Sequence, residues 1–290
     1  MNKSSEKDNI QEETPLESVD CQAKAHRQGG WKLVNLSHEG SSHKLSNRGC
    51  DDFSLTYYDN EKDLIIAVVS DGAGGYEGTN LGSQAVCEEF ADEIRKNLSL
   101  FNAIKTDNSV EESNSKSMPN DYHDKLLNLL KRVRKNAAQK LKLSTSADQL
   151  CATISGIILY NGMAYIFHIG DGHVFIEDEK GYLEVTSPQH GEYANETYFI
   201  NSDKGIQGAE IIIRCAVDIN KFLLSTDGLK DVLLSEGKAN MDTSEVLFKH
   251  LSEVAAEDFE KELSSFFQSD MITNCTDDDL SLVLGMRDKT

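Results

Sequence analysis

The sequence of 290 residues lacks two features that would place it in or across a membrane. No apolar run approaches the roughly 18 residues that a membrane-spanning helix needs. Residues 1–20 also lack the apolar segment of a secretory signal. We therefore expect a cytoplasmic protein that does not contact a membrane.

Paired cysteines and excess positive charge are also missing. The six cysteines are scattered and form no Cys-x-x-Cys pair, which argues against a zinc knuckle and a disulfide framework. The 29 Lys and Arg against 49 Asp and Glu give a net charge of −20, and a nucleic-acid binder needs a basic surface. We therefore expect no nucleic-acid partner. A phosphorylated substrate is still possible if something cationic sits in the site.

The composition is that of a globular protein, with 39% hydrophobic and 27% charged residues. Residues 1–30 are polar and are expected to form a disordered or loosely attached tail. No repeat or interior linker follows, so residues 31–290 are expected to form one domain. Within it, the polar stretch 103–120 is predicted to be a mobile loop.

Hydrophobic periodicity predicts blocks of strands with helices between them. Helices are expected at 81–98, 126–141 and 247–267, from apolar residues three or four positions apart. Strands are expected at 31–38, 53–58, 64–69, 152–160, 163–170, 172–178, 210–215, 222–226 and 280–285. Because strands and helices do not alternate strictly, the pattern favours an α+β domain with antiparallel sheets.

Several of these apolar strands stop at an Asp-Gly pair. LIIAVVSDGAGG (64–75) contains Asp71-Gly72, and Asp171-Gly172 and Asp227-Gly228 repeat the arrangement. A single Asp-Gly pair after a strand is most often a hairpin turn. Here, however, two further strands are preceded by acids, at 51–52 and at 277–279. Five strands thus carry carboxylates at one end.

If these strand ends converge, the carboxylates repel one another and their pKa values rise. Bound divalent cations remove that repulsion, and carboxylate and carbonyl oxygens suit Mg²⁺ or Mn²⁺. Two such ions about 3.5–4 Å apart can hold a water as hydroxide for in-line attack on a phosphoryl group. The pattern therefore indicates metal-dependent phosphoester hydrolysis.

The motifs also occur in a known order along the chain. From about Gly40 to Gly285 the sequence resembles the metal-dependent serine/threonine protein phosphatases of the type 2C (PPM) family in its bacterial form. The blocks that carry the resemblance are GSSHKLSNRGCDDFSL, AVVSDGAGGYEGTNLGSQAV, ATISGIILY, YIFHIGDGHVFI, SPQHGEYANETYFI, FLLSTDGLKDVL and DDDLSLVLG. The resemblance implies a four-layer α-β-β-α sandwich, in which pairs of antiparallel helices flank two central antiparallel sheets. It also implies hydrolysis of phosphoserine and phosphothreonine by a metal-bridging hydroxide.

The resemblance assigns metal ligands residue by residue. Asp71 matches the carboxylate that bridges two core ions, and Gly72 offers its carbonyl to the second ion. Asp171, Asp227 and Asp231 match a third, weaker site. Asp227 and Asp231 are four residues apart, so a helical turn after Gly228 would place them on one face. The full set of matched ligands is Asp51, Asp71, Gly72, Asp171, Asp227, Asp231 and Asp278.

The candidate catalytic residues Asp52, Arg48 and His43 precede the first of these acids. Asp52 matches an acid of the family, next to Asp51, which stands where the family usually has Glu. The family's phosphate-binding arginine falls at Asn47 here, so Arg48 either replaces it or only balances neighbouring acids. The histidine proposed as general acid in animal relatives falls at Ala73, which leaves leaving-group protonation to metal-bound water or another residue. His43 is a candidate phosphate contact.

Residues 190–200, HGEYANETYFI, match the region that borders the flap beside the family's active site. Glu192 and Asn195 are candidate substrate-binding residues, and a structural role is the alternative. The expected partners are phosphorylated proteins, such as a cognate serine/threonine kinase or its targets, and the expected state is a monomer. Two other functions stay open. One is a catalytically silent phosphoprotein-binding scaffold of the same fold, and the other is a phosphoesterase that acts on small phosphate esters.

Overall fold

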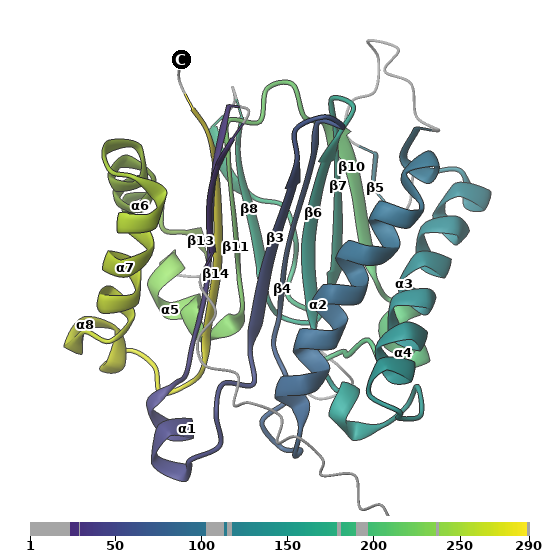
Figure 1. The fold of residues 1–290 in the computed structure, drawn as a ribbon, viewed down its shortest axis with the longest axis horizontal. Helices are drawn as coiled ribbons and strands as arrows, with labels where there is room; N and C mark the ends of the chain where they lie inside the picture. Colours follow the sequence, from purple (N-terminus) through teal and green to yellow (C-terminus); the bar gives the residue numbers. More distant parts are fainter. Residues whose placement is uncertain are drawn as a thin grey trace, which may run out of the picture.

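In the computed structural model, two antiparallel sheets lie face to face between two layers of helices (Figure 1). The structure describes residues 24–28, 30–102, 113–114, 118–178, 181–189, 197–235 and 238–288. The arrangement confirms the predicted α+β class and the four-layer α-β-β-α sandwich. Every strand pair within the two sheets is antiparallel.

Each sheet has six strands, and strands distant in sequence are neighbours in both. The first sheet runs in the order β1 (Lys24–Gln28), β2 (Trp31–His38), β14 (Leu280–Arg287), β11 (Lys221–Ser225), β8 (His173–Asp178) and β9 (Gly181–Glu184). The second runs β3 (Phe53–Asp59), β4 (Leu64–Ser70), β6 (Ile154–Tyr160), β7 (Met163–Ile169), β10 (Glu210–Cys215) and β5 (Ser113–Asn114). A short hairpin joins β12 (Leu234–Ser235) and β13 (Lys238–Ala239).

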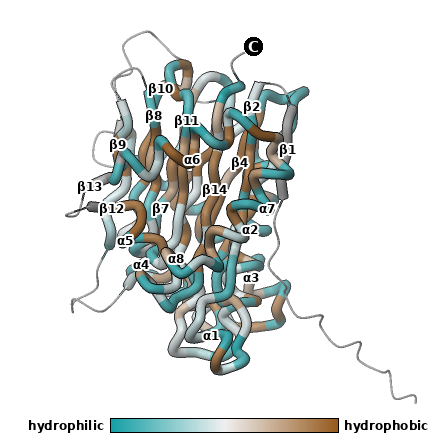
Figure 2. Tube along the Cα trace, turned by 90° about the vertical axis from the view of Figure 1, so that its left-hand side faces the viewer, coloured by the Kyte–Doolittle hydropathy of each residue, from teal (hydrophilic) through white to brown (hydrophobic). Residues whose placement is uncertain are grey.

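Residues 64–69 of strand β4 form a continuous apolar run because both faces of the strand are buried. Ile65, Ala67 and Val69 face the other sheet, and the alternate residues pack under the helices on the opposite side. All seven residues of β4 are buried, so no position needs a polar side chain facing water. Figure 2 shows the most hydrophobic stretches along such central strands. The strand ends only where Asp71 follows it.

Two helix pairs cover the outer faces of the sheets (Figure 1). The helices α2 (Thr79–Lys96) and α3 (Asn120–Lys140) pack on the second sheet, and α6 (Met241–Glu253) and α7 (Ala256–Phe267) pack on the first. Four short helices join these elements: α1 (Ser41–Ser46), α4 (Asp203–Gln207), α5 (Lys230–Leu233) and α8 (Asp270–Thr273). None of the described helices is both long enough and apolar enough to span a membrane.

The C-terminal helical region differs from the prediction. The single helix expected over 247–267 is two helices, because Val254 and Ala255 have extended backbone between α6 and α7. One continuous helix does not suit this segment because its apolar residues are spaced four apart. With 3.6 residues per turn, each such step drifts by about 40°, so 20 residues drift by about 200°. The break lets both apolar faces reach the first sheet.

The N-terminal boundary also differs from the prediction. Lys24–Gln28, assigned to the tail, forms the edge strand β1 against β2. The sequence of β1 has no apolar alternation that would predict a strand. The strand forms because its backbone pairs with β2. Residues 1–23 lie outside the described residues. Most of the predicted loop 103–120 does too, although Ser113–Asn114 forms β5 and Asn120 begins α3.

Candidate metal centre

Four carboxylates from different strand ends meet at one end of the sandwich. Asp71 follows β4, Asp171 lies between β7 and β8, Asp227 follows β11 and Asp278 precedes β14. Burial raises the pKa of Asp71 well above its usual range, and the carboxylates of Asp227, Asp171 and Asp278 raise it further. The predicted convergence of these four acids is therefore present. We call these four residues the acidic centre.

Asp227 shows how close the negative charges of the acidic centre lie. Burial, followed by the charges of Asp171 and Asp278, raises the pKa of Asp227 to about 7, while His173 acts in the opposite direction. Burial also raises the pKa of Asp278, although its side chain reaches the surface. Like charges held this close favour either bound protons or bound cations.

Backbone contacts fix Asp71 and Gly72 at the end of β4. The Asp71 N–H donates to the Thr153 hydroxyl at 2.9 Å, and the Thr153 N–H donates to the Asp71 carbonyl at 2.9 Å. The Gly72 N–H donates to the Asp51 carbonyl at 3.2 Å, and a Cβ on Gly72 would lie 2.7 Å from the same oxygen. Only glycine fits there, which brings residues 51–52 against the end of β4.

Asp52 lies inside the protein, behind the acidic centre. Its Oδ2 accepts a hydrogen bond from the Thr226 hydroxyl at 2.6 Å. Burial is the main reason that the pKa of Asp52 lies well above its usual range, and the negative charges of Asp71 and Asp279 raise it further. Asp52 therefore joins the acidic centre to the opposite sheet.

The donor set fits hard divalent cations. Asp171 Oδ2 accepts from the Thr197 hydroxyl at 2.5 Å, but Asp171 Oδ1 is buried and has no partner among the described residues. No Lys or Arg in the described ranges forms an ion pair with any residue of the acidic centre. Oxygen ligands with unbalanced negative charge are what Mg²⁺ and Mn²⁺ prefer.

Asp279, which the sequence analysis left unassigned, is a buried hydrogen-bonding hub. Its Oδ1 accepts from the Gly40 N–H at 2.7 Å, and its Oδ2 bonds His43 Nδ1 at 2.8 Å and the Asp51 N–H at 2.5 Å. The ligand atoms of His43, Asp51 and Asp279 lie within 4.8 Å of one another. Because Asp279 already accepts three hydrogen bonds, the acidic centre is the better cation site. The acidic run 277–279 was the only sequence signal for this role.

Arg48 lies beside this hub, and all three of its guanidinium nitrogens bond to the protein. Its Nε donates to Asp51 Oδ2 at 2.6 Å, and its other N–H groups donate to the carbonyls of Gly74 and Tyr76. The arginine thus balances Asp51 and holds the loop that follows Asp71. These contacts fit the alternative in which Arg48 balances an acid, and a phosphate contact stays a prediction. The side chain of Asp51 faces Arg48, and its ligand role also stays a prediction.

The remaining predicted residues are less informative. A helical turn does follow Gly228, and Asp231 lies in it as an exposed residue of α5, so its ligand role stays a prediction. Glu192 and Asn195 lie outside the described residues. Thr197, from the same region, is described and bonds Asp171.

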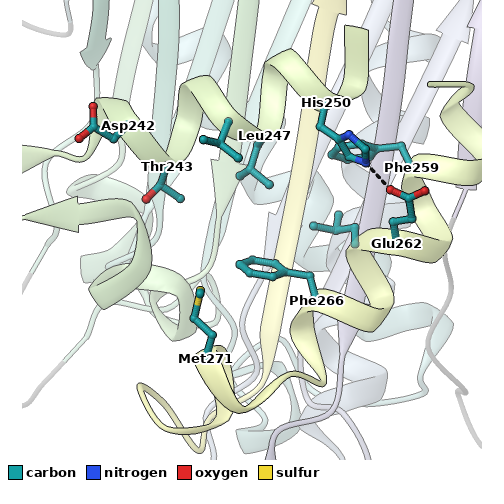
Figure 3. A pocket seen from close by; sticks show the side chains of 10 residues that line it. Asp242, Thr243, Leu247, His250, Phe259, Glu262, Phe266 and Met271 are labelled. Carbon is teal, nitrogen blue, oxygen red and sulfur yellow. Dashed lines mark hydrogen bonds and ion pairs between the residues drawn. The ribbon is translucent and has the colours of Figure 1, made fainter. Parts of the chain in front are cut away.

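An apolar cavity of about 550 Å³ lies elsewhere, between α6, α7 and α8 (Figure 3). Val246 and Met271 are exposed in its lining, and His250 and Glu262 form an ion pair at its rim. No residue of the acidic centre lines it. The cavity is therefore separate from the candidate metal centre.

Comparison with known proteins agrees with this geometry. A family model described as Protein phosphatase 2C matches residues 39–268. Serine/threonine-protein phosphatase 3 of Escherichia coli (strain K12) is 25% identical over 268 residues, which cover 88% of this chain and 98% of that protein.

Solved structures share the fold at lower identity. The serine/threonine phosphatase Stp1 from Staphylococcus aureus has a TM-score of 0.56 at 14% identity, covering 96% of this chain and 100% of that one. RsbX in complex with magnesium has a TM-score of 0.52 at 13% identity, covering 92% and 100%. The matched family model spans most of the sequence, including Asp71, Asp171 and Asp227. The chain therefore belongs to the protein phosphatase 2C family.

Proposed function

We propose that this chain is a Mg²⁺- or Mn²⁺-dependent phosphatase that hydrolyses phosphoserine and phosphothreonine in proteins. The observation that carries the proposal is the acidic centre itself. Its carboxylates come from four strand ends, and the other three raise the pKa of Asp71 beyond the effect of burial. No cationic side chain in the described ranges forms an ion pair with them. Membership of the protein phosphatase 2C family supports the same reaction class.

The cations would be held by Asp71, Asp227 and Asp278, with Asp171 at a further site and the Gly72 carbonyl as a neutral ligand. When bound, such cations attract the phosphate, polarise its P–O bonds and activate a water for attack. The cations also explain how a chain of net charge −20 can accept a phosphate ester. Two hydrogen bonds with Thr153 fix the backbone of Asp71 at the end of β4.

Two other functions make different predictions. A catalytically silent scaffold would be expected to have lost acidic ligands, but every matched ligand is present in the sequence. A phosphoesterase for small phosphate esters would use the same acidic centre and differ only in substrate preference. The first alternative thus concerns activity, and the second concerns specificity.

A side-by-side assay tests the proposal. The full chain is given phosphoserine and phosphothreonine peptides, nucleotides and 4-nitrophenyl phosphate, with Mn²⁺, with Mg²⁺ and after chelation. We expect metal-dependent hydrolysis with higher kcat/KM for the phosphopeptides, and loss of turnover in Asp278→Asn. A chain that binds phosphopeptides without hydrolysing them would support the scaffold, and preference for nucleotides would support the small-ester alternative.

A further inference from the structure

The half-buried His43 pairs with the buried carboxylate of Asp279, the residue that follows Asp278 of the acidic centre. Asp279 Oδ2 lies 2.8 Å from His43 Nδ1, and the N–H groups of Gly40 and Asp51 hold the same carboxylate. Because an ionised carboxylate only accepts hydrogen bonds, the proton of this contact belongs on His43 Nδ1. The imidazole is therefore held in one orientation by a side chain from the other end of the sequence.

The second ring nitrogen, Nε2, has no hydrogen-bond partner among the described residues. The His43 side chain is 13% exposed. Nε2 lies 4.0 Å from the position that a Cβ on Gly74 would occupy, so it faces the loop that leaves β4 at Asp71. A ring nitrogen of His43 also lies within 4.8 Å of a carboxylate oxygen of Asp51.

The other histidines near this end of the sandwich are engaged or enclosed. His38 Nε2 lies 2.9 Å from the ammonium group of Lys44. His168 and His173 are fully buried. The loop from Ala73 to Gly78 contains no histidine. Among the described residues, His43 thus presents the accessible imidazole nitrogen closest to this loop.

We propose that His43 is the general acid of the reaction and that Asp279 is its positioning residue. The inference rests on the proposed function. As water attacks phosphorus and loses one proton to solvent, the bond from phosphorus to the serine oxygen breaks. His43 acts as the imidazolium, with one proton on Nδ1 toward Asp279 and one on Nε2. The Nε2 proton moves to the serine oxygen, and the neutral imidazole then takes a proton back from solvent. The products are a serine hydroxyl and phosphate, and general acid catalysis of this kind contributes roughly 10²–10⁴-fold.

The dependence of rate on the leaving group tests this assignment. The amide of His43→Asn can keep a hydrogen bond to Asp279, but the variant lacks Nε2. A serine alkoxide needs a proton in order to leave, whereas 4-nitrophenolate is stable without one. With Mn²⁺ present, we expect kcat for a phosphoserine peptide to fall about 10²-fold or more, and kcat for 4-nitrophenyl phosphate to fall far less. Across a series of aryl phosphates, log kcat should depend more steeply on leaving-group pKa than in the wild type.

Matched variants separate proton donation from other roles. His43→Gln places an amide near the position of Nε2, where it can bind phosphate but cannot donate a catalytic proton. Recovery of peptide turnover in this variant would assign His43 to phosphate binding and overturn the proposal. Asp279→Asn should shift the leaving-group dependence in the same direction as His43→Asn, but by less. His250→Asn, on α6 at the rim of the separate apolar cavity, should leave every rate unchanged.

The outcomes also separate this inference from the proposed function. If the wild type hydrolyses phosphate esters and His43→Asn lowers all rates by the same factor, the general-acid role is wrong while the phosphatase stands. If the wild type hydrolyses no ester with Mn²⁺, the proposed function and the role of His43 fail together. Thermal unfolding of each variant shows whether the fold is retained.

Discussion

The hydroxyl of Thr226 donates a hydrogen bond to Asp52 Oδ2 at 2.6 Å, and this contact joins the two sheets at the end that carries the acidic centre. Thr226 follows β11 in the first sheet, and Asp52 precedes β3 in the second. The same threonine oxygen accepts the Ser281 N–H at 3.0 Å. One hydroxyl therefore connects Asp52, the residue before Asp227 and the start of β14 after Asp278.

Replacing Thr226 tests this connection. Thr226→Val keeps the side-chain shape but leaves a buried carboxyl and a buried N–H without their partner. We expect the free energy of unfolding to fall by about 1–3 kcal/mol, measured by urea denaturation, and turnover to fall with it. Thr226→Ser keeps the hydroxyl and should stay close to the wild type. Equal stability of the valine and serine variants would contradict the assigned role.

Asp71→Asn should separate stability from activity. Because the charges of Asp227, Asp171 and Asp278 oppose ionisation of Asp71, removing its charge relieves repulsion when no cation is bound. In chelator at pH 8 we expect the free energy of unfolding to rise by about 1–2 kcal/mol, while turnover with Mn²⁺ is lost. A variant that turns over normally with Mn²⁺ would remove Asp71 from the mechanism.

Asp171→Asn should be milder than Asp71→Asn. Thr197 can still donate to the retained amide oxygen, and the other three carboxylates keep their charges. We expect partial loss of turnover that recovers as the Mn²⁺ concentration is raised, measured as the metal concentration at half-maximal rate. A loss as complete as that of Asp71→Asn, with no recovery at high Mn²⁺, would place Asp171 among the core ligands.

Without cations, stability should depend on pH through Asp227. Its pKa is raised from 3.8 to about 7 by burial and by Asp171 and Asp278, so between these values the folded chain holds a proton that the unfolded chain has released. The free energy of unfolding therefore falls as pH rises from about 4 through 7. Urea midpoints in chelator should show this decline, and saturating Mn²⁺ should oppose it. The decline should be shallower in Asp227→Asn, and an unchanged slope would contradict the raised pKa.

Gly228→Ala tests the tight approach of two segments. A Cβ on Gly228 would lie 1.9 Å from the Asp279 carbonyl, so the turn at Asp227 or the start of β14 must shift. We expect a loss of about 2–3 kcal/mol in the free energy of unfolding and weaker cation binding, measured by urea denaturation with and without Mn²⁺. Gly75→Ala is the control, because a Cβ there meets nothing within 4 Å and the backbone is not left-handed.

The sequence alone determined the central strands, the helices α2 and α3, and the positions of acids at strand ends. Strand β4 is a continuous apolar run because both of its faces are buried, and such local patterns need no knowledge of the neighbours. The Asp-Gly pairs indicated the acidic centre because an acid that directly follows an apolar strand can also be recognised from local sequence. The order of these motifs indicated the sandwich that the structure confirms.

Only the tertiary structure decided how distant segments meet. The Asp51 N–H bonds Asp279, 228 residues away, and this contact selects the buried carboxylate of the acidic run 277–279. The pairing of Arg48 with Asp51 and with the carbonyls of the loop after Asp71 likewise depends on packing. The break between α6 and α7 and the pairing of β1 depend on the shape and register of the first sheet. Local periodicity carries no information about such contacts, because they are set by the path of the whole chain.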